Sequence, residues 1–203
     1  MEHTFIASTI DAGTLDEWLI LEKLWSPYHL TGNLVVPQGQ TMTINDGAYL
    51  RIADQVTITV EGTFTSGFST ISSMGGGARW GGLVVGDNAE TSVQILGSSL
   101  VEGSPLMTVN DDADVIFSHA SLARSSGAEP LLRTTNSAQG TLHLVSTTFT
   151  DSASHCFESQ GSVSITMENV DMQNCQSDAI WAQSVELMAD GLAVTDTVSL
   201  GAV

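Results

Sequence analysis

Val93-Gln94-Ile95, followed by Leu100, forms the first copy of a pattern that recurs through the second half of the chain. Four further strand-like pieces begin 22, 27, 21 and 22 residues apart, and an apolar residue stands seven positions after each start. The pieces are Val115-Ile116-Phe117, Leu142-His143-Leu144, Val163-Ser164-Ile165 and Val185-Glu186-Leu187, and the apolar residues are Leu122, Phe149, Val170 and Leu192. A fixed period of this length is typical of stacked units, none of which buries its apolar face alone.

Each repeat contains a third short strand, at residues 106–109, 131–133, 156–158, 179–181 and 198–200. Three strands in about 22 residues favour a coil in which each strand lies beside its copy in the next repeat, in the same direction. We therefore predict an all-β fold, a right-handed parallel β-helix (β-solenoid) with three short strands per coil. The residue before each apolar position is small or polar and is expected at a tight corner: Ser99, Ser121, Thr148, Asn169 and Gly191.

Residues 1–29 differ from the rest of the chain. Thr14-Leu15-Asp16-Glu17 has the spacing of a helix capping box, and apolar residues follow it. This favours a short helix over about 15–24, with a strand over 18–21 as the alternative. We expect residues 1–29 to cap the stack and residues 30–203 to form a β-helix that continues in a longer protein.

Between the cap and the repeats, the chain reads as short strands separated by turns. Strands are expected at 33–36, 41–44, 48–52 and 56–60, where apolar and polar residues alternate. Glycine, proline, asparagine and aspartate stand between them and favour turns.

Several short motifs in this part resemble those of a known family. They are Ser26-Pro27-Tyr28, Leu30-Thr31-Gly32, Val36-Pro37-Gln38-Gly39, Val60-Glu61-Gly62-Thr63-Phe64 and Trp80-Gly81-Gly82-Leu83. The chain resembles the right-handed parallel β-helix repeat family, within the pectate-lyase-like superfamily, and its secreted or surface-anchored modules in particular. The resemblance implies a non-catalytic adhesion or scaffold module, located outside the cell or at its surface.

The charge of the chain limits the classes of partner that it can bind. Five Lys and Arg residues stand against 23 Asp and Glu residues, a net charge of −18. Such a field repels phosphate backbones and anionic lipids, so we expect neither nucleic acid binding nor membrane insertion. Carbohydrate and protein surfaces remain as partners. No run of apolar residues is long enough to span a bilayer, and no signal peptide is visible.

Few residues point to chemistry. Asp111, Asp112 and Asp114 offer hard oxygen ligands, so a calcium site is the one metal or cofactor site that we predict, against the alternative of a solvated turn. A polysaccharide lyase or hydrolase is the alternative function, but the chain lacks the Gly-His-Gly and Arg-x-Lys motifs of such hydrolases. We assign no catalytic residue. Arg124 aligns with Glu102 and Asp151 and is expected in a structural charge ladder.

Two further features concern covalent and subunit contacts. Cys156 and Cys175 lie in consecutive repeats at different offsets, which leaves a disulfide and two buried free thiols as alternatives, with free thiols slightly favoured. The strand that holds Val198, Leu200 and Val203 is apolar and lacks a polar cap. We expect it to self-associate end to end or to continue the solenoid, and a filament-forming subunit is a further alternative.

Overall fold

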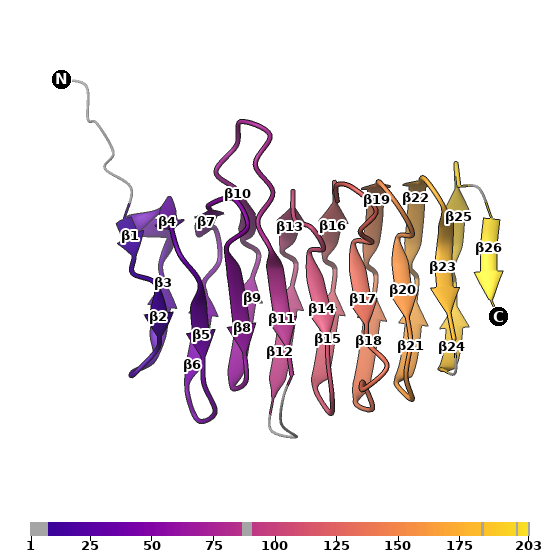
Figure 1. Ribbon diagram of the computed structural model, residues 1–203, viewed down its shortest axis with the longest axis horizontal. Coiled ribbons are helices and arrows are strands. Elements are labelled where there is room, and N and C mark those ends of the chain that lie inside the picture. The colour runs from indigo at the N-terminus through magenta and orange to yellow at the C-terminus, as the bar shows by residue number, and fades with distance from the viewer. Residues whose placement is uncertain (1–7, 87–90, 184, 198, 203) are drawn as a thin grey trace.

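Three parallel sheets surround one apolar core in the computed structural model of the chain, which describes residues 8–86, 91–183, 185–197 and the backbone of 199–202. The chain passes through one strand of each sheet in turn, so successive coils stack into a rod with β1 near one end and β26 at the other (Figure 1). The stack has 8 turns of about 23 residues. The predicted all-β parallel β-solenoid with three strands per coil is confirmed.

The described strands form sheets A, B and C. Sheet A contains β1 (Ser8–Ile10), β4 (Tyr28–Leu30), β7 (Tyr49–Ile52), β10 (Thr70–Ser73), β13 (Ser99–Val101), β16 (Ser121–Ala123), β19 (Thr148–Ser152), β22 (Asp171–Cys175) and β25 (Ala193–Thr195). Sheet B contains β2 (Gly13–Thr14), β5 (Leu34–Val36), β8 (Thr57–Val60), β11 (Gly82–Val85), β14 (Met107–Val109), β17 (Leu132–Thr134), β20 (Phe157–Ser159), β23 (Asp178–Ala182) and β26 (Ser199–Ala202). Sheet C contains β3 (Leu19–Leu21), β6 (Thr41–Ile44), β9 (Thr63–Gly67), β12 (Ser92–Leu96), β15 (Asp114–Ser118), β18 (Thr141–Val145), β21 (Ser164–Glu168) and β24 (Glu186–Asp190).

Alternation along each strand explains why the coil closes. In β18, Leu142 and Leu144 are fully buried, whereas His143 between them faces outward. The neighbouring coils repeat this pattern in register, so that like residues form inward columns along the rod. The core is therefore a stack of apolar columns, and each coil is buried by the coils above and below it.

The register of the last repeats differs from the sequence prediction. Leu142 pairs with Ile165 rather than with Val163, and Phe149 pairs with Met172 rather than with Val170. The column then continues to Val194 instead of Leu192. A slip of two residues keeps every side chain on the same face of a strand, so the alternation alone does not reveal it.

The corners between sheets are made by residues with positive φ. Between sheets C and A they form the column Gly97, His119, Ser146, Asn169 and Gly191, with φ from 47° to 70°. At the end of the sheet A strands, where the chain turns toward sheet B, they form the column Glu102, Arg124, Asp151, Asn174 and Asp196, with φ from 50° to 64°. Asn169 and Gly191 thus lie at a corner as predicted, but Ser99, Ser121 and Thr148 begin strands instead.

One coil is five residues longer than the coil before it, because the starts of β15 and β18 are 27 residues apart and those of β12 and β15 only 22. Three of the extra residues lie between β16 and β17, and two lie between β17 and β18. The strands on both sides still pair in register. The additional length is therefore confined to the corners.

The first coil is built from strands, and the predicted helix over 15–24 is wrong. β2 pairs with β5, and β3 pairs with β6, so the strands on either side of residues 15–18 extend sheets B and C. The alternative prediction of a strand over 18–21 agrees with β3. A single 3-10 turn, η1 (Lys23–Trp25), follows β3. The backbone groups of β2 and β3 form hydrogen bonds with the parallel strands β5 and β6. This pairing outweighs the local preference for a helix. The division of the chain at residue 29 stays a prediction.

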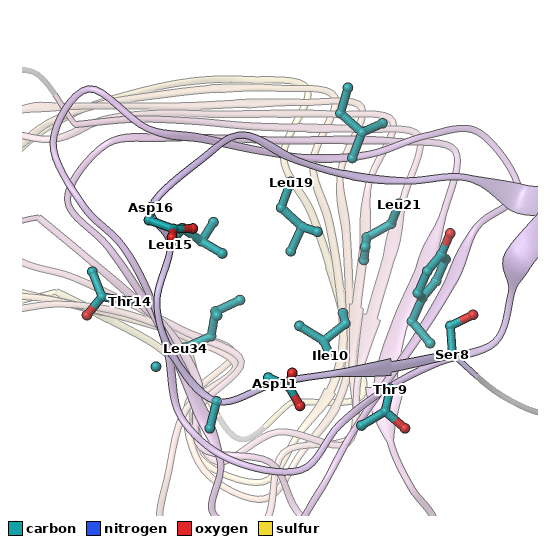
Figure 2. A pocket seen from close by; sticks show the side chains of 14 residues that line it. Ser8, Thr9, Ile10, Asp11, Thr14, Leu15, Asp16, Leu19, Leu21 and Leu34 are labelled. Atoms are coloured by element: carbon teal, nitrogen blue, oxygen red, sulfur yellow. The ribbon is translucent and has the colours of Figure 1, made fainter.

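The first coil surrounds a hollow at its end of the rod, which is lined by apolar side chains together with polar ones that include Asp11 and Asp16. The hollow has a volume of about 370 Å³. Figure 2 shows Ile10, Leu15, Leu19, Leu21 and Leu34 around it. These side chains belong to the same inward columns that are closed by neighbouring coils elsewhere in the rod.

Candidate functional site

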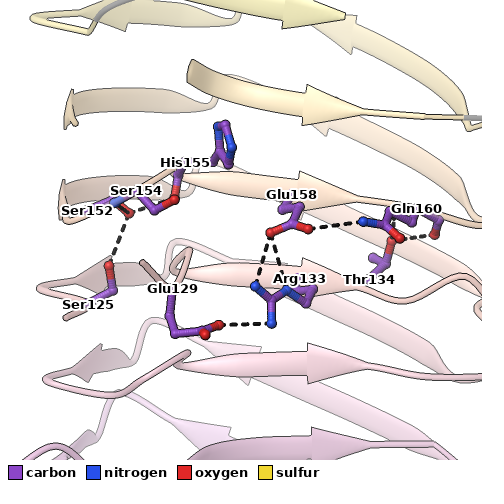
Figure 3. Close-up of polar contacts among 9 residues, drawn as sticks. All are labelled: Ser125, Glu129, Arg133, Thr134, Ser152, Ser154, His155, Glu158 and Gln160. Carbon is purple, nitrogen blue, oxygen red and sulfur yellow. Dashed lines mark hydrogen bonds and ion pairs between the residues drawn. The ribbon is translucent and has the colours of Figure 1, made fainter. Parts of the chain in front are cut away.

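An ionic cluster on the outer face of sheet B is the most organised polar feature among the described residues. Arg133 in β17 lies directly beside Glu158 in β20. The Arg133 guanidinium donates through Nη2 and Nε to Glu158 Oε2, at 3.1 and 3.3 Å, and its Nη1 lies 2.9 Å from Glu129 Oε2. Glu158 Oε1 accepts a further hydrogen bond from Gln160 Nε2 at 3.1 Å (Figure 3). Arg133, the only basic residue in the cluster, is thus held between two carboxylates.

A polar hollow of about 470 Å³ lies beside this cluster. Two of its lining residues make hydroxyl contacts with neighbouring coils: the buried Thr134 and Ser159 hydroxyls are 2.7 Å apart, and Thr135 Oγ1 donates to Asn110 Oδ1 at 3.0 Å. The lining is neutral or paired, and consists of Arg133, Thr134, Thr135, Asn136, Ser137, Glu158 and Gln160. Such a surface offers hydrogen bonds to a polar ligand, but it places no activated nucleophile beside a base.

His155 lies between a carboxylate and an aromatic ring. Its Nδ1 is 3.6 Å from Asp178 Oδ2, and its ring centroid is 6.3 Å from that of Trp181. A serine is also close, but the Ser152 hydroxyl donates to the main-chain oxygen of His155 at 2.6 Å and not to its ring (Figure 3). Ser152, His155 and Asp178 therefore do not form the proton relay of a serine hydrolase.

The predicted calcium ligands lie at the corner before and at the start of β15. Asp112 and Asp114 are exposed, and Asp114 Oδ1 accepts a hydrogen bond from Thr141. Within the described residues, no group of three or more His, Cys, Asp or Glu side chains is gathered so that it could hold a metal ion. The calcium site at Asp111, Asp112 and Asp114 stays a prediction to which this geometry adds no support.

The charge ladder around Arg124 is present in part. Arg124 Nη2 lies 3.4 Å from Glu102 Oε1, and the Ser73 hydroxyl donates to the other oxygen of Glu102 at 2.7 Å. Asp151 instead accepts a hydrogen bond from Asn174 Nδ2 at 2.7 Å. The column therefore consists of corner residues, and the exposed ion pair between Arg124 and Glu102 contributes little to stability.

The cysteines form a disulfide between Cys156 and Cys175, with Cα atoms 5.4 Å apart. The slight preference for free thiols in the sequence is therefore wrong. Cys175 lies at the end of β22, beside Ser152 of the preceding coil, and the corner after β19 brings Cys156 back to the same place. The repeat offsets of the two cysteines are unequal because Cys175 is in register with Ser152 and not with Cys156.

The predicted self-association residues lie largely outside the described residues. Val198 and Val203 are not described, and the structure describes only the backbone of Leu200, which belongs to β26. β26 pairs with β23 along one edge. Self-association through these side chains therefore stays a prediction.

Comparison with known proteins gives no match, whether against family models, curated proteins or solved structures. The described residues include no helix that is long and apolar enough to cross a membrane. The fold agrees with the β-helix architecture of the family that the sequence motifs resemble. Membership of the pectate-lyase-like superfamily is not supported by any match, and what the chain is known to share with that family is the parallel β-solenoid.

Proposed function

We propose that the chain is a non-catalytic β-solenoid module that serves as an adhesion or scaffold segment at a cell surface or outside the cell. The observation that carries this proposal is the closure of the outer ionic cluster. Arg133 is occupied by Glu129 and Glu158, and Glu158 is further occupied by Gln160. A lyase would need a base that is free to reach its substrate, and a hydrolase would need carboxylates that face each other across a substrate.

The disulfide supports the location outside the cytosol. Disulfides persist in oxidising compartments, whereas the reducing cytosol keeps most thiols free. Cys156 and Cys175 are both almost fully buried, so the bond is part of the core rather than an exposed redox group. A module with this bond is suited to an extracellular surface, where a rigid rod can hold attached segments at fixed distances.

The test is an assay for polysaccharide cleavage. The chain is incubated with polygalacturonate and with a neutral polysaccharide, and new reducing ends and unsaturated ends are measured. We expect no release above that of a heat-denatured sample. The control pair is Glu158→Gln, in the cluster, and Glu168→Gln, at the exposed end of β21. Cleavage that Glu158→Gln abolishes and Glu168→Gln retains would replace the scaffold proposal with the enzyme alternative.

A filament-forming subunit is the second candidate, and one observation favours it. Leu187 continues the inward column of Leu142 and Ile165, yet 38% of it is exposed. The hollow in the first coil offers inward apolar side chains, among them Leu19 and Leu21, at the opposite end of the rod. Two chains stacked end to end would bury both surfaces in a head-to-tail contact that repeats along a fibre.

Sedimentation velocity at micromolar concentration tests this second candidate. The wild-type chain should form oligomers, and Leu187→Lys should shift them toward monomer because it places a charge in the contact. The matched control is Gln94→Lys, on the outer face of sheet C in the middle of the rod. Equal sedimentation of all three as monomers would exclude the filament.

A further inference from the structure

An exposed apolar cluster distinguishes the first coil from the rest of the outer surface. Seven large hydrophobic side chains are exposed among the described residues, and four of them lie within residues 18–25. Trp18, Ile20, Leu24 and Trp25 are 71%, 53%, 78% and 63% exposed. We call these four residues the 18–25 patch. Exposed large apolar side chains concentrated in one short segment are the kind of feature that marks interaction sites on soluble proteins.

Ile20 faces outward from sheet C rather than into the core. In β3, Leu19 and Leu21 turn toward the core, so Ile20 between them turns outward, beside Thr43 of the next coil. None of the three residues of η1 is buried. Another coil stacked on the axis of the rod would therefore cover the hollow but would leave Ile20 on the outer face.

The backbone that carries the patch is held by specific contacts. The Tyr28 hydroxyl accepts from Glu22 N at 2.9 Å and donates to Glu22 O at 3.0 Å. The Ser8 hydroxyl donates to Trp25 O at 3.1 Å. The Lys23 stem lies so close to Gly47 that a Cβ there would be 2.8 Å from Lys23 Cδ. A partner would thus meet a preorganised surface, which lowers the entropy cost of binding.

The segment that carries the patch is also acidic. Asp16, Glu17 and Glu22 are exposed beside it, and Lys23 is the single basic residue among them. The whole chain, including these residues, has a net charge of −18. A second copy that bound the patch through this same face would bring these carboxylates together, and anionic lipid would be repelled in the same way. A partner surface with an apolar face and a basic rim complements both the side chains and the charge.

We propose that the 18–25 patch is a docking site for a basic amphipathic segment of a partner protein. The two tryptophans act as apolar anchors, as tryptophans commonly do in binding hot spots, and the carboxylates at the rim pair with lysine or arginine. This deepens the proposed role as an adhesion or scaffold module by naming the kind of partner that the rod would hold.

Two synthetic helical peptides with the same leucine face test the site, one with lysine and one with glutamate on the polar face. Binding to the full chain is measured by calorimetry and by tryptophan fluorescence. We expect the leucine–lysine peptide to bind and the leucine–glutamate peptide to bind at least about tenfold more weakly. The double variant Trp18→Ser/Leu24→Ser should bind the leucine–lysine peptide at least about tenfold more weakly than wild type does. Phe68→Ser, at another exposed aromatic residue, should leave binding unchanged.

The controls separate the site from generic attraction and from folding defects. Glu17→Gln/Glu22→Gln should weaken binding and reduce its dependence on salt. The single variants Trp18→Ser and Leu24→Ser accompany the double variant, and circular dichroism melts establish that each one folds. If the folded patch variants bind the leucine–lysine peptide as tightly as wild type, attraction to the acidic surface alone explains the binding and the proposal fails.

Three further results would also overturn the docking site. They are equal binding of both peptides, dimerisation that the patch variants abolish, and a fluorescence shift with phosphatidylcholine vesicles in the absence of any peptide response. None of them depends on the polysaccharide assay. An enzyme activity would therefore overturn the proposed function and leave this test intact, and a failed peptide test would leave the non-catalytic assignment standing.

Discussion

Leu142 and Leu187 stand in the same inward column of sheet C, but they have different surroundings. Leu142 lies in β18 between two paired strands and is fully buried, whereas Leu187 lies in β24, pairs with β21 and is 38% exposed. The residue type, the sheet and the register position are the same. Leu142 has a paired strand on each side, whereas Leu187, among the described strands, has one on a single side. Stability in this rod is therefore a sum of nearest-neighbour contacts, as expected for stacked repeats.

The same substitution at these two leucines should give the largest contrast. We expect Leu142→Ala to cost about 2–5 kcal/mol, because it removes buried methyl groups and leaves a cavity between two coils. Leu187→Ala should cost about 1 kcal/mol or less, because that side chain already contacts solvent. Denaturant unfolding of the two variants measures both values. Equal losses would mean that the final coil is as well buried in solution as the middle coils.

Removal of the disulfide should be the next largest effect. Cys156→Ser/Cys175→Ser opens a link of 19 residues that joins two consecutive coils. We expect a loss of about 3 kcal/mol, mainly because the unfolded chain gains freedom. In this variant, the rate of amide hydrogen exchange should increase most in the coils beyond β20. A thiol titration of the wild-type chain, purified without reductant and unfolded, should find no free thiol, and two free thiols would contradict the bond.

The contrast between corner and face can be sharpened with two histidines. His119 lies at a corner with φ of 53°, whereas His143 lies on the outer face of β18 in extended backbone. His119→Val should cost about 1–2 kcal/mol, because a β-branched side chain fits the left-handed region poorly. His143→Val should change stability by about 0.5 kcal/mol or less. Thermal melts of the two variants measure this, and a reversed order would mean that the corners are assigned to the wrong residues.

The smallest effect is expected at the solvated turn before β15. Asp112 is exposed, and Asp112→Ala should change stability by less than about 0.5 kcal/mol in the absence of calcium. The measurement is a thermal melt with and without calcium, on wild type and variant. A rise in the melting temperature with calcium that only the wild type shows would support the predicted metal site.

The sequence predicted the fold because inward and outward residues alternate in almost every strand. It misplaced the register of the last repeats because Val163 and Ile165 are both buried, so both satisfy the apolar pattern. Only the lengths of the corners distinguish them, and those vary from coil to coil. The predicted helix failed for a related reason: Thr14 and Glu17 satisfy a local rule, but β5 and β6 offer pairing partners that no local rule includes.

The candidate sites were harder to predict than the fold. Arg133 and Glu158 meet because their strands are adjacent, although they are 25 positions apart in the sequence. The third member, Glu129, lies in the enlarged corner, where the period of the repeat is broken. The 18–25 patch was hidden by the helix interpretation, which assigned its tryptophans to a cap. The alternative interpretation, a strand over 18–21, agrees with β3 and turns Ile20 outward, which reveals part of the patch.

The five extra residues between β15 and β18 show how this architecture can acquire new segments. Both flanking coils keep their pairing, so a change in length at a corner is not transmitted along the rod. Loop closure becomes only slowly more costly as a loop grows. A gene of this kind can therefore gain or lose codons at its corners while its strands remain aligned. For protein engineering, the corner after β16 is accordingly the natural place to graft a foreign peptide for display.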